Sequence, residues 1–189
     1  MLGYSALIME HFRHSWGSNK IIESHHLFEI ARNVGTRLTG SGLMLVTAES
    51  CTGGWLGQAV TAISGSSAWY ERGFITYSNA AKCEMLGVQP TTLEHYGAVS
   101  LQTAREMVLG ALNRSHAHIG VSITGIAGPE GGTATKPVGT VCFAWAMKQG
   151  SVRQQTHLFP GNREEIRCQA VAAALQGILE ILNDAATVA

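Results

Sequence analysis

The sequence has few charged residues and no excess of either sign. Charged residues make up 14% of its 189 residues, and thirteen Lys and Arg balance thirteen Asp and Glu. Proteins that bind nucleic acid non-specifically need a broad positive field, which this sequence lacks. We therefore expect no nucleic-acid partner.

Cysteine is also scarce, and its spacing excludes two classes of protein. The four cysteines lie far apart and form no Cys-x-x-Cys motif: Cys51, Cys83, Cys142 and Cys168. Neither a zinc knuckle nor a dense disulfide framework is indicated, so free thiols in a reducing cytoplasm are the simpler interpretation. The eight histidines include no His-Glu-x-x-His motif. We expect no metal site and no cofactor.

Long hydrophobic runs are missing as well. No stretch approaches the about 18 apolar residues of a membrane-spanning helix, and residues 1–20 do not resemble a secretory signal. We expect no membrane association and a cytoplasmic location. Hydrophobic residues nevertheless make up 46% of the sequence, which excludes a disordered chain and suggests that another subunit covers some apolar surface. We expect a homo-oligomer, a dimer or larger.

Apolar runs alternate with helical repeats along most of the chain. Residues 1–22 show no clear period and are interpreted as an N-terminal extension to one domain over 23–189. The repeats predict helices over 27–38, 53–64, about 82–86, from 101 after a Ser100 cap, and 166–182. Strands are predicted over 43–47, 73–78, 119–124, 140–147 and 152–158, the last two as a hairpin. This order predicts an α/β fold, a single three-layer α/β/α sandwich with a mixed, mostly parallel sheet.

Three loops follow predicted strands, where α/β sheets bind ligands. The turn at 50–54 joins a strand to a helix, so it can direct N–H groups at an anion or oxyanion, and it carries two nucleophiles, Ser50 and Cys51. The second loop carries Tyr77 and Lys82 as proton carriers, and the third, at 124–139, is rich in glycine. Together the loops could build an amide-hydrolysing site.

Each motif also has a simpler interpretation. Serine before a helix is more often an N-cap than a nucleophile, and an arbitrary lysine is usually a solvated surface charge. The Gly-x-x-Gly-Pro loop at 125–129 matches neither the P-loop nor the dinucleotide fingerprint.

Several blocks of the sequence, in order, resemble one known family. They are Thr47-Ala-Glu-Ser-Cys-Thr-Gly-Gly-Trp55, Gly65-Ser-Ser-Ala-Trp-Tyr-Glu-Arg-Gly-Phe74, Thr76-Tyr-Ser-Asn79 with Lys82, Gly97-Ala-Val-Ser100, and Thr124-Gly-Ile-Ala-Gly-Pro129 with Lys136-Pro-Val-Gly-Thr-Val141. The resemblance is to the CinA C-terminal domain, the nicotinamide-nucleotide amidohydrolase family, in its stand-alone form, and it covers about residues 25–183. It implies metal-free hydrolysis of nicotinamide mononucleotide to nicotinate mononucleotide and ammonia, in pyridine-nucleotide salvage.

The resemblance also implies roles for individual residues. Ser50 would be the nucleophile and Lys82 its base, with Tyr77 as a further catalytic residue. The expected substrate-binding residues are Cys51, Thr52, Gly53, Gly54, Thr124, Gly125, Ala127, Gly128 and Arg163. Asn162 stands where relatives commonly have Asp. For the substrate phosphate, the backbone of 125–132 with Arg163 or Arg167 is our hypothesis.

The base role places a physical demand on Lys82. With an ordinary pKa of about 10.4, only about 0.04% of a lysine is neutral at pH 7. Its pKa must therefore be lowered, through burial or a neighbouring cation; a value of about 8 corresponds to roughly 3.3 kcal/mol.

Two alternatives stay open at the level of sequence. Cys51 is intrinsically more nucleophilic than its neighbour, so a cysteine amidase is possible, although no histidine is obviously placed to pair with it. In a second alternative, the same loops hold a nucleotide without chemistry, as a binding or regulatory module.

Overall fold

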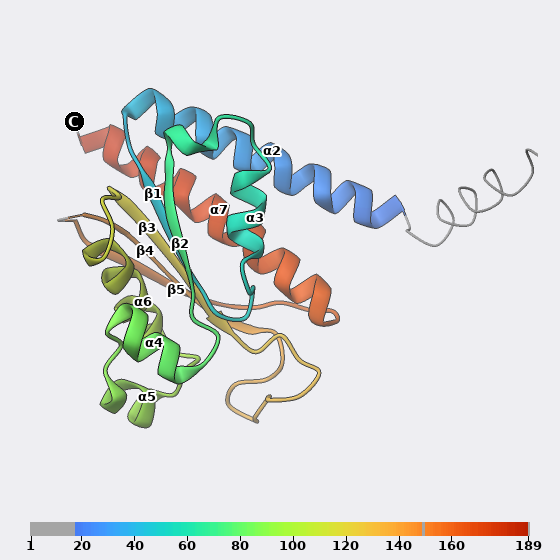
Figure 1. Ribbon diagram of the computed structural model, residues 1–189. Helices are drawn as coiled ribbons and strands as arrows, with labels where there is room; N and C mark the ends of the chain where they lie inside the picture. The colour runs from blue at the N-terminus through green and yellow to red at the C-terminus, as the bar shows by residue number, and fades with distance from the viewer. Residues whose placement is uncertain (1–17, 149, 189) are drawn as a thin grey trace, which may run out of the picture.

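The computed structural model describes residues 18–148 and 150–188, which form one sheet between two layers of helices (Figure 1). The helices are α2 (Ser18–Ser41), α3 (Trp55–Thr61), α4 (Asn79–Leu86), α5 (Pro90–Tyr96), α6 (Leu101–Asn113) and α7 (Arg163–Val188), with a 3₁₀ turn at Ser66–Ala68. The strands are β1 (Leu45–Glu49), β2 (Tyr70–Ile75), β3 (Ile119–Gly125), β4 (Thr140–Met147) and β5 (Val152–Leu158).

The five strands lie in the order β2-β1-β3-β4-β5. Strand β1 pairs in parallel with both β2 and β3, whereas β4 runs antiparallel to β3 and β5. Four of the five strands therefore point the same way. The predicted mixed, mostly parallel sheet is confirmed, and the antiparallel strand is the first arm of the predicted hairpin.

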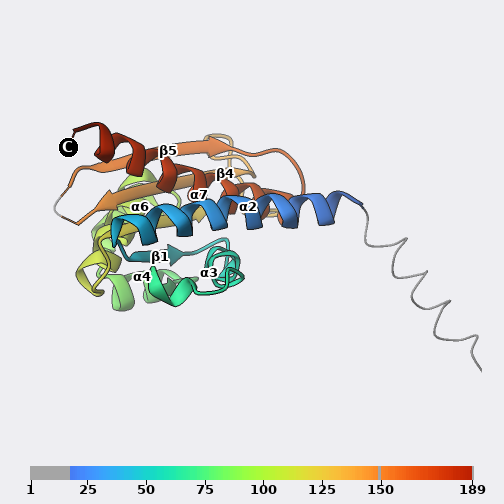
Figure 2. The same ribbon diagram turned by 90° about the horizontal axis from the view of Figure 1, so that it is seen from above.

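Helices cover both faces of the sheet and bury a separate core on each (Figures 1 and 2). On one face, α2, α3 and α7 pack around Leu38, Leu45 and Trp145. On the other, α4 and α6 pack around Val46 and Met107. Neighbouring residues of β1 thus belong to opposite cores, as the alternation of side chains along a strand requires. The three-layer α/β/α prediction is confirmed.

Most predicted elements agree with the structure to within about three residues, and the clearest differences are the starts of α2 and β2 and the additional helix α5. Helix α2 begins at Ser18, inside the expected extension. This start was not predicted because residues before 27 carry no apolar repeat that would mark a helix. Residues 1–17 lie outside the described part of the chain. Strand β2 begins at Tyr70, three residues before the predicted start. The pattern did not show this start because β2 is an edge strand whose side chains are partly exposed. Helix α5 was not predicted, since seven residues are too few to show a period.

The parallel strands bring the three predicted loops to one edge of the sheet. Strands β1, β2 and β3 end at Glu49, Ile75 and Gly125, and the chain leaves each of them at the same edge. Helix α4 starts close behind β2, with the Ser78 hydroxyl accepting the N–H of Ala81 as its N-cap. None of the helices in the described ranges is long and apolar enough to cross a membrane.

Candidate active site

A buried lysine and a serine are in direct contact at this edge. The Nζ atom of Lys82 donates to Ser50 Oγ at 2.9 Å and to the carbonyl oxygen of Thr76 at 2.9 Å. Ser50 itself is held by its N–H, which donates to the carbonyl of Ile123 in the neighbouring strand. Lys82 reaches the serine because α4 begins only a few residues after β2. The two residues therefore form the pair that the resemblance implies.

Burial gives Lys82 the electrostatic property that a base needs. Its side chain is only 1% exposed, and none of the ion pairs among the described residues involves it. Removing an ammonium group from water without a carboxylate partner disfavours its charged form. Desolvation accordingly lowers the pKa of Lys82. Once neutral, the amine can accept the proton of the Ser50 hydroxyl across the same contact.

The pair lies in a cavity of about 200 Å³ built from all three loops and from the segment before α6. Eight residues predicted from the sequence line it: Ser50, Cys51, Tyr77, Lys82, Thr124, Gly125, Ala127 and Arg163. Three more residues line it that were not predicted as site residues, Asn79, Ala98 and Val99, although all three lie in blocks that carry the family resemblance. Tyr77 is 62% exposed, so the cavity is open to solvent beside it.

A positive charge lies at the mouth of this cavity. The guanidinium of Arg163 donates to Tyr77 Oη at 2.9 Å and to the carbonyl of Gly128 at 2.8 Å. Arg163 is the first residue of α7, and the Asn162 side chain caps that helix by accepting the N–H groups of Glu164 and Glu165. The neutral amide therefore serves as the cap that a carboxylate could also supply.

Two side chains fix the wall formed by Ala98 and Val99. Thr124 Oγ1 donates to the carbonyl of Ala98 at 2.7 Å. Lys136 Nζ, from the glycine-rich loop, donates to the carbonyls of Tyr96 at 2.8 Å and Val99 at 2.7 Å. The loop after β3 thus holds the segment before α6 against the site.

Four of the predicted binding residues do not line the cavity: Thr52, Gly53, Gly54 and Gly128. Two other residues act on the turn at 50–54: Glu49 was not singled out from the sequence, and Arg167 was expected only as an alternative donor to the substrate phosphate. Glu49 accepts hydrogen bonds from the start of α3, and Arg167 donates to the backbone of the turn at 50–54. The roles of the four residues in substrate binding stay predictions.

The structure also bears on the cysteine alternative and on metal ligands. The thiol of Cys51 lines the cavity, but burial raises its pKa to about 12, so it stays protonated near neutral pH. Within the described ranges, no cluster of three or more His, Cys, Asp or Glu residues could hold a metal ion.

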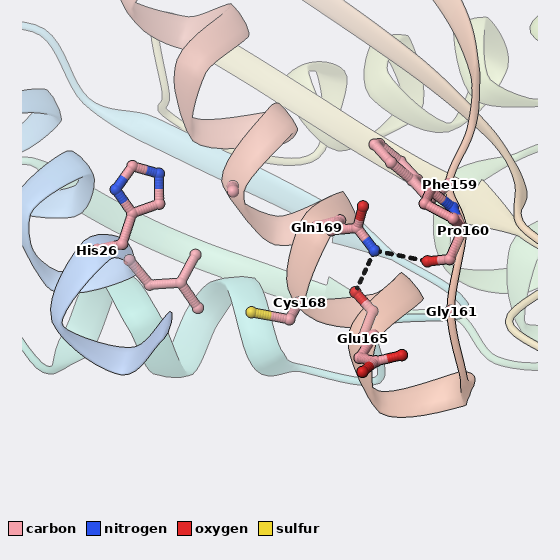
Figure 3. A pocket seen from close by; sticks show the side chains of 9 residues that line it. His26, Phe159, Pro160, Gly161, Glu165, Cys168 and Gln169 are labelled. Carbon is pink, nitrogen blue, oxygen red and sulfur yellow. Dashed lines mark hydrogen bonds between the residues drawn. The ribbon is translucent and has the colours of Figure 1, made fainter. Parts of the chain in front are cut away.

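A larger cavity of about 550 Å³ lies elsewhere, between α2, α7 and the segment at 159–161 (Figure 3). Its walls are mostly apolar, and the Gln169 amide donates to the carbonyls of Pro160 and Glu165 there. Glu165, Cys168 and Gln169 face this cavity from α7, whereas Arg163 lines the smaller one. No serine or lysine lines it. The Ser50–Lys82 pair thus lies in the smaller cavity and not in this one.

Comparisons with known proteins agree with this geometry. A sequence profile described as the CinA C-terminal domain matches residues 27–182. The chain is 52% identical over 153 residues to "Nicotinamide-nucleotide amidohydrolase PncC" of Enterobacter agglomerans, with 81% of this chain and 93% of that protein covered. The protein of the same name from Escherichia coli K12 is 51% identical over 150 residues, with 79% of this chain and 91% of that protein covered.

A solved structure matches the fold as well. The structure titled "competence/damage inducible protein CihA" from Agrobacterium tumefaciens superposes with a TM-score of 0.81 at 50% identity, covering 84% of this chain and 96% of that one. Sequence profile, close relatives and fold therefore lead to one conclusion: the chain belongs to the CinA C-terminal domain family.

Proposed function

We propose that this protein hydrolyses the carboxamide of nicotinamide mononucleotide, releasing ammonia and nicotinate mononucleotide, with Ser50 as nucleophile and Lys82 as base. The observation that carries the proposal is the 2.9 Å contact between Lys82 Nζ and Ser50 Oγ in a buried site. Support for the substrate comes from the relatives named nicotinamide-nucleotide amidohydrolase, about half of whose residues are identical to those of this chain.

The first half of the reaction forms an acyl-enzyme. Neutral Lys82 takes the proton of the Ser50 hydroxyl while Oγ bonds to the carboxamide carbon, and the carbonyl electrons move to its oxygen. The tetrahedral intermediate then collapses, the C–N bond breaks, and the ammonium of Lys82 returns its proton to the departing nitrogen. Ammonia leaves, and the nicotinoyl group remains as an ester on Ser50.

The second half repeats these steps with water. Lys82 removes a proton from a water molecule as its oxygen attacks the ester carbon. Collapse of this second intermediate breaks the bond to Ser50 Oγ, which regains a proton from Lys82. The enzyme is restored, and the product carries a carboxylate in place of the amide. One lysine thus serves as base and acid in both halves.

The size of the cavity indicates how the substrate lies. Sites that enclose a whole small molecule usually measure about 300–1,000 Å³, whereas this cavity measures about 200 Å³. We place the pyridine ring and its carboxamide inside, against Ser50 and Lys82. The ribose and phosphate then extend past Tyr77 toward the guanidinium of Arg163, which supplies a charged donor for the phosphate.

We further propose a cytoplasmic homo-oligomer. All four cysteines are free thiols, as expected of a reducing compartment. Several large apolar side chains are exposed, including Ile75, Tyr77 and Met85, and a second subunit would cover such surface.

Substitution of the pair tests the mechanism. Ser50→Ala and Lys82→Ala should each lower kcat for ammonia release by at least about 10³-fold, because each removes a group that takes part in bond making. Cys51→Ala should stay within about tenfold of wild type, since its buried thiol is protonated. Ammonia is measured by a coupled assay without added metal. A wild type that binds the mononucleotide but releases no ammonia would instead favour the binding-module alternative.

The lowered pKa of Lys82 predicts a pH dependence. Activity requires the neutral amine, so kcat/KM should rise with pH through an apparent pKa below the ordinary value of about 10.4. Between those two values the unfolded chain binds more protons than the folded one, so the free energy of unfolding should also rise with pH. In Lys82→Met that rise should be smaller. A profile that rises only above pH 10 would contradict the assignment.

The placement of the phosphate predicts a selective effect of Arg163. Arg163→Gln should raise KM for the mononucleotide about tenfold or more, with a smaller change in kcat, because the contact is made equally before and during reaction. Tyr77→Phe removes the hydrogen bond to Arg163 but keeps the charge, and serves as the comparison. Steady-state kinetics decide the point. An unchanged KM for Arg163→Gln would remove this residue from the phosphate site.

The oligomer proposal predicts a particle of at least twice the 20.1 kDa chain mass. Size-exclusion chromatography with light scattering at micromolar concentration gives that mass directly. Ile75→Lys introduces a charge at an exposed apolar position beside the site, and it should weaken association if the subunits meet there. A single 20 kDa species at all concentrations would refute the proposal.

A further inference from the structure

The residue before the nucleophile holds the start of α3 through a buried carboxylate. Glu49 is only 1% exposed. One of its oxygens accepts from Thr52 Oγ1 at 2.7 Å, Gly54 N at 3.0 Å and Leu56 N at 3.1 Å, and the other accepts from Gly57 N at 2.8 Å. Four donors therefore compensate the burial of this charge.

This contact closes the start of α3 to other anions. The N–H groups that a helix N-terminus usually offers to a phosphate or an oxyanion are here donated to Glu49. A substrate oxygen that used them would have to displace a buried carboxylate. This leaves the rest of the turn that carries the nucleophile, which we call the Ser50 turn and define as residues 50–54, as a source of N–H donors for the oxyanion.

Arg167 holds the Ser50 turn from the other side. Its Nε atom donates to the carbonyl of Cys51 at 3.1 Å, and a terminal nitrogen donates to the carbonyl of Thr52 at 2.7 Å. The guanidinium also lies over the Trp55 ring, with its central carbon 5.2 Å from the ring centroid. A planar fork fits two consecutive carbonyls in a way that a lysine ammonium does not.

These contacts set the direction of the N–H groups in the turn. A trans peptide is planar, with its N–H opposite its C=O, so the N–H of Thr52 points away from Arg167. The N–H of Gly53 donates to the carbonyl of Ser50 at 3.0 Å. Within the described part of the chain, the N–H of Thr52 has no hydrogen-bond acceptor, and the N–H of Cys51 contacts only the thiol of its own side chain. They belong to the two residues that directly follow the nucleophile.

We propose that Glu49 and Arg167 are positioning residues that hold the Ser50 turn between them as a clamp, so that the N–H of Cys51, a residue that lines the cavity, binds the oxyanion formed when Ser50 attacks. The inference rests on the proposed function, because it assumes that attack. It separates the two arginines of α7: Arg163 lines the cavity and faces the substrate, whereas Arg167 acts through the backbone.

Arg167→Lys is the main test because it keeps the charge and removes the fork. We expect kcat to fall at least tenfold with KM for the mononucleotide within about twofold, because oxyanion contacts form only in the transition state. The apparent pKa of the kcat/KM profile should stay at the wild-type value, since Lys82 is unchanged. Arg105→Lys, an exposed arginine on α6, is the matched control and should behave as wild type.

Glu49→Gln supplies a second, independent variant. The amide keeps the shape but replaces one acceptor oxygen with a donor facing N–H groups, so the same selective loss of kcat is expected. Glu49→Asp keeps the charge on a shorter side chain, and it should recover part of the lost kcat. Circular dichroism and Tm confirm that each variant is folded. Should Glu49→Gln fail to fold, Arg167→Lys decides the proposal alone.

Two outcomes would overturn the proposal. If Arg167→Lys raises KM and leaves kcat unchanged, Arg167 binds the substrate directly. If every variant keeps wild-type kcat, the clamp has no role in the reaction.

A second substrate separates failure of the clamp from failure of the proposed function. Acylation of Ser50 by p-nitrophenyl acetate, followed by mass spectrometry, requires the nucleophile and the oxyanion donors but no nucleotide. A wild type that is acylated but does not deamidate the mononucleotide refutes the proposed function, and slower acylation of Arg167→Lys then still supports the clamp. A wild type that undergoes neither reaction refutes both.

Discussion

The site depends on one unfavourable arrangement, a lysine amine buried without a carboxylate partner. Water stabilises an ammonium group far better than the two oxygens that Lys82 meets, Thr76 O and Ser50 Oγ. Lys82 is held in the interior because it lies on the short helix α4, which packs on α6. The same burial that disfavours the charge makes the amine available as a base. Stability and chemistry therefore compete at this position.

The rest of the molecule can be understood as support for that arrangement. Parallel strands β1, β2 and β3 deliver three loops to one edge, and each loop is then tied to a neighbour through a side chain and a carbonyl. Thr124 and Lys136 hold the segment before α6, and Arg167 holds the turn after β1. These contacts join segments that are distant in the sequence. The reacting groups are thereby fixed before any substrate arrives, as preorganised catalysis requires.

The sequence predicts those parts of the structure that depend on local patterns. Runs and repeats of apolar residues predict the buried strands β3 and β4 and the long helix α7. The family motifs predict that Ser50 and Lys82 act as a pair. Edge strand β2 is misplaced because solvent removes the alternation from its side chains, and α5 is too short to show a period.

The positioning residues are harder to find in a sequence. Glu49 could as well have been a solvated carboxylate, since nothing local shows that the next turn would fold back onto it. The contact of Arg167 with the Ser50 turn joins positions more than 110 residues apart in sequence. Such contacts depend on how the layers pack, which a periodic pattern does not encode.

The amide cap on α7 has a consequence for how quickly an anionic ligand arrives. Asn162 accepts the first N–H groups of the helix without adding a negative charge beside Arg163. The positive end of the helix dipole and the guanidinium act in the same direction at the entrance, and the carboxylates of Glu164 and Glu165 in the same turn oppose them. A chain with zero formal net charge offers little long-range attraction, so a phosphate responds to the local balance of these charges, over roughly one Debye length, about 8 Å at physiological ionic strength. Encounter rates with a nucleotide should depend on salt even though the protein as a whole is neutral.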